Sequence, residues 1–200
     1  MSRSDHGLRL SFNSPVVLTF SIMCLAALIL GALTGGASTN LVFSVYRSSL
    51  TDPLTFVRFI GHVFGHSGIE HFTGNMTLLL VIGPMLEEKY GSKNLLIVIF
   101  TTAIITGVAH FVLFPGVRLL GASGVVFAFI LLASFASFRE GTIPLTFVLV
   151  AVIYIGGQIW NGIFLADNVS NLTHILGGAV GSVLGFAMGR PRRRSVFGQR

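Results

Sequence analysis

Strongly polar side chains are rare within the long apolar runs of this 200-residue sequence, and each is a candidate for chemistry. His174 lies in one such run and is followed at helical spacing by Gly177, Gly181 and Gly185. These positions share one face of a helix, and a stripe of glycines allows a second helix to approach closely. His174 is therefore expected at a tight helix–helix contact, where it could be a general base or a buried histidine with a structural hydrogen bond.

Ser123 is a candidate nucleophile. It opens another apolar run, and its neighbours Gly121, Ala122 and Gly124 have almost no side-chain volume. A serine at the start of a helix lies beside unpaired backbone N–H groups, which favour developing negative charge. Such a position suits the oxyanion of acyl transfer, although small-residue patches are also common in membrane helices that catalyse nothing.

His71 and Asn75 form a third polar element. They are spaced i, i+4, so they lie on one face of a helix in a further apolar run. Both could donate hydrogen bonds to an oxyanion, or they could brace a loop. If they converge with Ser123 and His174, the three elements supply a nucleophile, a base and oxyanion donors.

Six apolar runs must position these residues. Hydrophobic residues make up 52% of the chain and charged residues 10%, against ~25% charged in soluble domains. Each run approaches the ~20 residues that cross a bilayer as a helix, and a helix satisfies its own backbone hydrogen bonds in lipid. The sequence therefore predicts an all-α membrane protein whose single domain, residues 15–189, has spans at about 15–34, 69–86, 95–114, 122–138, 145–164 and 172–188.

The polar segments predict an orientation. Residues 1–14 and 190–200 are short tails, and residues 35–68 are expected to form a loop at the membrane interface. With a cytoplasmic N-terminus, ten of the 13 Lys and Arg residues fall on the cytoplasmic side. This positive-inside bias predicts that both termini are cytoplasmic. The basic tail is interpreted as the end of a membrane span that contacts anionic lipid, and nucleic-acid binding is not expected.

Other hydrolytic chemistries fit the sequence less well. The sequence has no H-E-x-x-H motif, and His66 and His71 would lie ~140° apart on a helix. All aspartates lie outside the runs or at their edges, so an aspartyl pair is not available. Lys89 and Lys93 fall at the membrane face opposite Ser123. A single cysteine excludes a multi-cysteine metal site, and no metal or other cofactor is expected.

The chain resembles the rhomboid family of intramembrane serine proteases from about residue 56 to residue 185. The resemblance is carried, in the family's order, by HVFGHSGIEHFTGN (62–75), EEKYGS (87–92), GASG (121–124) and THILGGAVG (173–181). It implies a rhomboid-like bundle of six transmembrane helices. It also implies that Ser123 is the nucleophile, that His174 is the general base, and that His71, Asn75 and the Ser123 backbone N–H form the oxyanion hole.

Supporting roles follow from the same resemblance. The upstream histidines brace the region between the loop and the second span, and a glutamate supports the cytoplasmic end of that span. With the close-packing glycines, the supporting residues are His62, His66, Glu87, Gly177 and Gly181. Two positions depart from the family pattern. Phe127 replaces a tyrosine that stacks on the base in many bacterial members, and Val57 replaces the tryptophan of a Trp-Arg pair.

The expected function is hydrolysis of peptide bonds in or near the transmembrane segments of other membrane proteins, through an acyl-enzyme. The expected partners are these substrates and membrane lipid, and the compact form suggests a multi-pass protein of a bacterial cytoplasmic membrane. Two alternatives remain open. One is a catalytically inactive rhomboid-like protein that binds membrane clients. The other is a small channel or transporter, for which the last three runs offer one mid-span histidine and no carboxylate.

Overall fold

The computed structural model describes residues 11–135 and 168–189, together with residues 143, 145–146, 148–149, 152–153 and 156. The helices in these parts are α1 (Pro15–Leu33), α2 (Ala37–Leu41), α3 (Pro53–Gly61), the 3-10 turn η1 (His62–Phe64), α4 (Ile69–Tyr90), α5 (Ser92–Leu113), α6 (Ser123–Ser134) and α8 (Asn168–Gly189). The prediction of an all-helical protein is confirmed for these residues. Their only β pairing is a single bridge between Val45 and Leu119.

Three of these helices are long and apolar enough to cross a membrane: Pro15–Leu33, Ser92–Leu113 and Val169–Met188. They coincide with the runs expected at 15–34, 95–114 and 172–188. The run expected at 69–86 corresponds to α4, which continues to Tyr90. Most of the run expected at 145–164, the end of the run at 122–138, and residues 1–10 and 190–200 of the tails lie outside the described residues.

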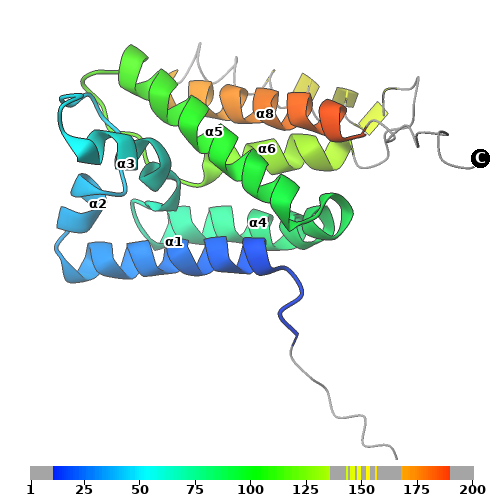
Figure 1. The fold of residues 1–200 in the computed structure, drawn as a ribbon, viewed down its shortest axis with the longest axis horizontal. Helices are drawn as coiled ribbons and strands as arrows, with labels where there is room; N and C mark the ends of the chain where they lie inside the picture. The colour runs from blue at the N-terminus through cyan, green and yellow to red at the C-terminus, as the bar shows by residue number, and fades with distance from the viewer. Residues whose placement is uncertain are drawn as a thin grey trace, which may run out of the picture.

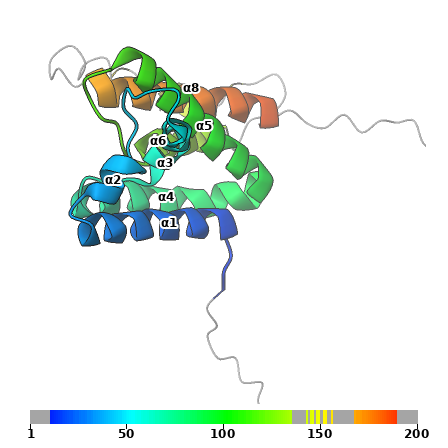
Figure 2. The same cartoon turned by 60° about the vertical axis from the view of Figure 1, so that its left-hand side comes forward.

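The helices form two layers joined by α5 (Figures 1 and 2). In one layer α1 packs against α4, and in the other α6 packs against α8. Helix α5 crosses between them and contacts both α4 and α8. The short helices α2 and α3 lie at one end of the bundle, where α2 packs on α1 and α3 packs on α5.

Helix α6 lies at the centre of the packing. Its side chains at Val125, Phe129 and Leu132 are fully buried in the main hydrophobic cluster. By contrast, α1 and α4 carry large apolar side chains on their outer faces, with Ile29 49% and Val81 73% exposed. An outer surface of this kind suits lipid and would be costly in water.

The glycine face of α8 lies directly on α6. A Cβ built on Gly177 would lie 2.1 Å from the carbonyl oxygen of Gly124, and one on Gly181 would lie 2.1 Å from that of Ala128. Real Cβ atoms do not approach oxygen this closely, so only glycine permits this spacing of the two helices. The contact fixes the height of α8 along α6, and with it the position of His174.

Glu87 holds the beginning of α1. Its carboxylate accepts hydrogen bonds from the backbone N–H groups of Val16 at 3.0 Å and Val17 at 3.1 Å, and from the Ser92 hydroxyl at 2.7 Å. The first N–H groups of a helix have no partner within it and carry partial positive charge. A carboxylate from α4 therefore caps α1, while the N-cap residue Ser14 makes no side-chain cap.

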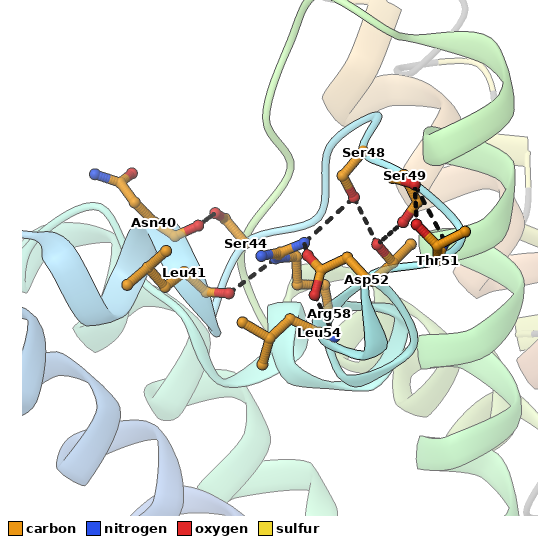
Figure 3. A network of polar contacts seen from close by, with 10 residues as sticks. Asn40, Leu41, Ser44, Ser48, Ser49, Thr51, Asp52, Leu54 and Arg58 are labelled. Atoms are coloured by element: carbon orange, nitrogen blue, oxygen red, sulfur yellow. Dashed lines mark hydrogen bonds and ion pairs between the residues drawn. The ribbon is translucent and has the colours of Figure 1, made fainter.

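The segment 35–68 is folded around the buried side chain of Arg58, as Figure 3 shows. The guanidinium donates to the Leu41 carbonyl at 2.8 Å, the Asp52 carboxylate at 3.1 Å and the Ser48 hydroxyl at 3.3 Å. It also lies 4.7 Å from the centre of the Tyr46 ring. The bridge between Val45 and Leu119 ties this segment to the strand-like stretch that leads into α6.

Candidate active site

Ser123 is the first residue of α6, immediately after a sharp turn at Gly121. The backbone N–H of Gly121 donates to the carbonyl of His62 at 2.9 Å. Gly121 has φ +133°, and a Cβ there would lie 2.8 Å from atoms Cε1 and Nε2 of the His71 ring. Both the backbone conformation and the available space therefore require glycine. The turn brings the start of α6, with the N–H groups of its first residues, close to the side chain of His71.

His174 lies on α8, and its ring stacks on Phe127. The ring centroids are 3.9 Å apart and the planes differ by 7°. Phe127 is four residues after Ser123, so both lie on the same face of α6. Gly177, one turn after His174, contacts Gly124. The imidazole is thus held over the face of α6 that carries Ser123, and the phenyl ring occupies the stacking position that sequence analysis considered.

His71 lies in the first turn of α4, and each edge of its ring faces a different neighbour. Ser67 Oγ lies 3.2 Å from His71 Nδ1, while Nε2 and Cε1 face the backbone of Gly121. Asn75 lies one turn later and is buried. Its side-chain amide donates to the His71 carbonyl at 3.0 Å. The structure therefore brings His71 against the turn before Ser123, with one Asn75 hydrogen used by the α4 backbone.

His66 supports His71 from behind. Its ring contacts the rings of His71, at a centroid distance of 5.1 Å, and Phe72, at 5.5 Å. Its Nδ1 donates to the Phe64 carbonyl at 3.2 Å. Burial, with a smaller effect of His71, lowers the pKa of His66 to about 4, so His66 is neutral at pH 7.

His62 links the turn before Ser123 to α3 and α5. Its carbonyl accepts from Gly121, its Nδ1 donates to the Arg58 carbonyl at 3.1 Å, and its Nε2 lies 3.2 Å from Thr106 Oγ1. Burial lowers the pKa of His62 to about 4. His62 thus positions the turn through its backbone and anchors it through its ring.

Sequence analysis did not single out Ser67 or the threonines of α5. Thr106 bonds His62, and the methyl groups of Thr102 and Thr106 pack around Gly124. The signal for the threonines is their spacing with His110, because positions 102, 106 and 110 share one helix face in an otherwise apolar run. Ser67 lies in a loop, where no periodic pattern would mark it.

The arrangement consists of the His174 imidazole, the serine Ser123 at the N-terminus of α6, and the His71 imidazole beside the backbone of the turn before Ser123. Glu87, by contrast, lies at the far end of α4, where it caps α1. No group of three or more His, Cys, Asp or Glu side chains that could hold a metal occurs within the described parts of the chain. A serine, an imidazole and hydrogen-bond donors of these types suit acyl transfer.

Comparisons with known proteins show which family the sequence matches. The family model described as the Rhomboid domain matches residues 53–191. Rhomboid protease GlpG of Yersinia pestis is 26% identical over 187 residues, which cover 91% of this chain and 66% of that protein. The mouse protein Rhomboid-related protein 2 is 28% identical over 160 residues, which cover 70% of this chain and 53% of that protein. The chain therefore spans between about half and just under two thirds of the length of these curated relatives.

Proposed function

Because the chain belongs to the rhomboid family, we propose that it is an intramembrane serine endopeptidase in which Ser123 is the nucleophile and His174 the general base. One observation carries the assignment of these residues. The His174 ring stacks on Phe127, which lies one helical turn from Ser123. The close contact between α8 and α6 that allows this stack is possible only with glycine at position 177. A histidine within an apolar helix costs free energy in a membrane, and such residues usually belong to functional sites.

In the proposed first step, His174 accepts the hydroxyl proton of Ser123 while the serine oxygen attacks the carbonyl carbon of the substrate peptide bond. The new C–O bond places negative charge on the carbonyl oxygen. As this tetrahedral intermediate collapses, the C–N bond breaks and His174 gives its proton to the leaving amine. His174 then removes a proton from water as the water oxygen attacks the acyl carbon. The ester C–O bond to Ser123 breaks, and His174 returns the proton to the serine oxygen, which restores Ser123 and releases the acid product.

The oxyanion is proposed to accept hydrogen bonds from the Ser123 backbone N–H, His71 and Asn75. A Ser67 hydroxyl that donates to His71 Nδ1 leaves the ring proton on Nε2, the tautomer that can donate to an oxyanion. An asparagine amide has two donor hydrogens, and only one is needed for the bond to the His71 carbonyl. Removing one oxyanion donor typically lowers the rate by ~10²–10³.

Phe127 acts as a positioning residue for His174. A phenyl ring cannot hydrogen-bond the imidazole, so Phe127 orients the base through the parallel stack, above the glycine contact between α8 and α6. Aromatic pairs of this kind contribute ~0.5–1.5 kcal/mol beyond the area that they bury.

The proposed setting is a domain of six transmembrane helices at residues 15–189 in a bacterial cytoplasmic membrane, with both termini in the cytoplasm. The apolar outer faces of α1 and α4 and the positive-inside bias of the sequence support it. Substrates are then other membrane proteins, whose backbone must be locally extended to reach Ser123.

The test is cleavage of a generic transmembrane substrate by the purified protein in detergent. Wild type is compared with Ser123→Ala, His174→Ala and the control Ser134→Ala, which removes a serine hydroxyl from the other end of α6. We expect cleavage by wild type and Ser134→Ala only, and labelling of Ser123 by a fluorophosphonate probe. Cleavage by Ser123→Ala would refute the mechanism. An inert wild type with an unlabelled Ser123 would favour the client-binding alternative.

A further inference from the structure

The connection between α5 and α6, residues 114–122, leads directly into Ser123, the first residue of α6. Its backbone is hydrogen-bonded to other parts of the molecule at three alternate residues: Val117, Leu119 and Gly121. Two of these contacts join backbone groups, because Leu119 pairs with Val45 and Gly121 donates to the His62 carbonyl. The contact at Val117 is different, since it is made by a histidine side chain of α5.

His110 is the residue that makes this contact. It lies in the last turn of α5, and its Nε2 is 3.0 Å from the carbonyl oxygen of Val117. A carbonyl can only accept, so Nε2 carries the proton of this hydrogen bond. His110 is 2% exposed, and its ring stacks on Phe114 with centroids 5.5 Å apart and planes that differ by 23°. Packing therefore fixes the direction in which the donor points.

A histidine costs free energy at this position. Helix α5 is apolar and long enough to cross a membrane, and strongly polar side chains are unfavourable in such a helix. The second ring nitrogen of His110, Nδ1, is buried without a hydrogen-bond partner among the described residues, which adds to the cost. A leucine would avoid both penalties. The hydrogen bond to Val117 is therefore the polar contribution of this ring that a leucine could not replace.

The same face of α5 contacts the chain on both sides of Ser123. Three residues at i, i+4 and i+8 share this face: Thr102, Thr106 and His110. The methyl groups of the two threonines lie 3.6 and 3.5 Å from the position that a Cβ on Gly124 would take. Thr106 Oγ1 also lies 3.2 Å from Nε2 of His62, whose carbonyl accepts from Gly121. Helix α5 thus holds the backbone after Ser123 through its threonines and the backbone before it through His110.

The placement of Ser123 depends on this connection. Val117 precedes the serine by six residues, and the turn between them has little room to absorb a shift, because Gly121 already lies against the His71 ring. A displacement of ~1 Å can lower a catalytic rate ~10²-fold. A connection released at Val117 would therefore misplace the serine hydroxyl relative to His174.

We propose that His110 is a positioning residue for Ser123. Its hydrogen bond to the Val117 carbonyl fixes the connection 114–122, and through that backbone it sets the place of the nucleophile relative to the general base. His110 acts at a distance and does not contact the reacting atoms. This inference rests on the proposed protease function and assigns a further residue to it.

The experiment uses the full-length protein in detergent, with a transmembrane substrate and with a fluorophosphonate probe that labels Ser123. Three replacements of His110 are compared with wild type. His110→Gln places an amide nitrogen as many bonds from Cα as Nε2, His110→Asn places it one bond closer, and His110→Leu has no donor. The matched control is Leu95→Ala, which removes a fully buried side chain from the other end of α5.

We expect His110→Leu and His110→Asn to lower kcat and the rate of Ser123 labelling together by ~10- to 10²-fold, with KM little changed. His110→Gln should stay close to wild type. The unfolding midpoint of His110→Leu should also stay close to wild type, because leucine suits an apolar helix, while hydrogen exchange at the amides of Leu119 and Gly121 becomes faster. Leu95→Ala should lower the midpoint through its cavity and leave kcat unchanged.

Three results would overturn the role of His110. A normal kcat in His110→Leu would mean that the connection needs no hydrogen bond from α5. Equal losses in His110→Gln and His110→Leu would assign the effect to the shape of the ring and not to its donor. A loss of kcat in Leu95→Ala as large as that in His110→Leu would assign it to lower stability. A wild type that neither cleaves nor is labelled at Ser123 would instead refute the protease function, and the role of His110 with it.

Discussion

On the α8 side of Ser123, helix backbones touch, whereas on the α4 side the contacts are made by histidine side chains. Gly177 and Gly181 place α8 against carbonyl groups of α6, and this contact tolerates no added atom. On the other side His66, His71 and the backbone of His62 hold the turn through ring contacts and hydrogen bonds. A backbone contact fixes position, and a side-chain network fixes proton locations and orientation. Substitutions on the α8 side should therefore lower stability and activity together, whereas substitutions on the α4 side should mainly lower activity.

The broadest effect is expected from Gly177→Ala, which should lower both stability and activity. The new Cβ would meet the carbonyl oxygen of Gly124, and backbone cannot rotate away as a side chain can. Overpacking of this kind costs ~1–3 kcal/mol, and moving α8 also shifts His174. Both the thermal unfolding midpoint in detergent and the cleavage rate should fall.

The matched control is Gly178→Ala, on the same turn of α8. Its Cβ would be 3.6 Å from the Leu131 side chain, which is an ordinary contact. Because alanine is the better residue in a helix interior, this variant should unfold at or above the wild-type temperature. If the two variants had the same midpoint, the backbone contact would not carry the position of α8.

A change on the other side should affect catalysis more than stability. In Gly121→Ala the new methyl would meet the His71 ring, and the residue would have to adopt φ +133°. Displacing His71 or the turn should lower kcat by ~10²–10³, the cost of one oxyanion donor. Gly116→Ala is the control, because a Cβ there has open space. A Gly121→Ala enzyme with normal kcat would remove His71 from the mechanism.

A smaller effect is expected from replacing Phe127, the α6 side chain that stacks on His174. Phe127→Leu keeps an apolar group on α6 but removes the ring that stacks on His174. A stack of ~0.5–1.5 kcal/mol corresponds to a loss of roughly 2- to 10-fold in kcat, with KM little changed. Phe127→Tyr keeps the ring and should remain close to wild type. A fall of similar size in both variants would indicate that packing, and not the stack, is what matters.

Mild acidification should have the smallest effect, a small loss of unfolding free energy through His62 and His66 on the α4 side of Ser123. The folded protein keeps His62 and His66 neutral, with pKa values of about 4 against 6.5 for ordinary histidine. Between these values the unfolded chain binds more protons, so stability is complete above pH 6.5 and decreases as the pH falls toward 4. The unfolding free energy measured from pH 7.5 to 6.0 should therefore begin to decline, and less steeply in His66→Asn. Equal slopes would indicate that other groups cause the decline.

The sequence predicts most of the α8 side, because it depends on spacing alone. Gly177, Gly181 and Gly185 share a helix face with His174, and in the structure that face lies on α6. Apolar runs also locate the helices, although they misplace several helix ends by a few residues. The run at 69–86 stops where charges begin, yet α4 continues to Tyr90 and ends at Gly91, which has φ +82°. Hydropathy marks the edge of lipid, whereas the hydrogen-bond ladder ends where the backbone turns.

The histidine side is less accessible to sequence reasoning. The motif HVFGHSGIEHFTGN identifies its members, but it does not predict that Ser67 bonds His71 or that Asn75 bonds its own helix. The fold of residues 35–68 depends on pairs that are far apart in sequence, such as Arg47 with the Phe111 carbonyl at 2.6 Å. Pairings of this kind have no periodicity, so they emerge only once the helices are packed.

The cap on α1 has a consequence for biosynthesis. The backbone groups that Glu87 caps belong to residues 71 and 70 positions earlier in the chain. At ~5–20 residues per second, the ribosome takes roughly 4–14 s to deliver that carboxylate after the start of α1 has emerged. Until then the first N–H groups of α1 must donate their hydrogen bonds to water or lipid headgroups. Glu87 can therefore fix the start of α1 only after α4, the helix that carries this carboxylate, has been synthesised.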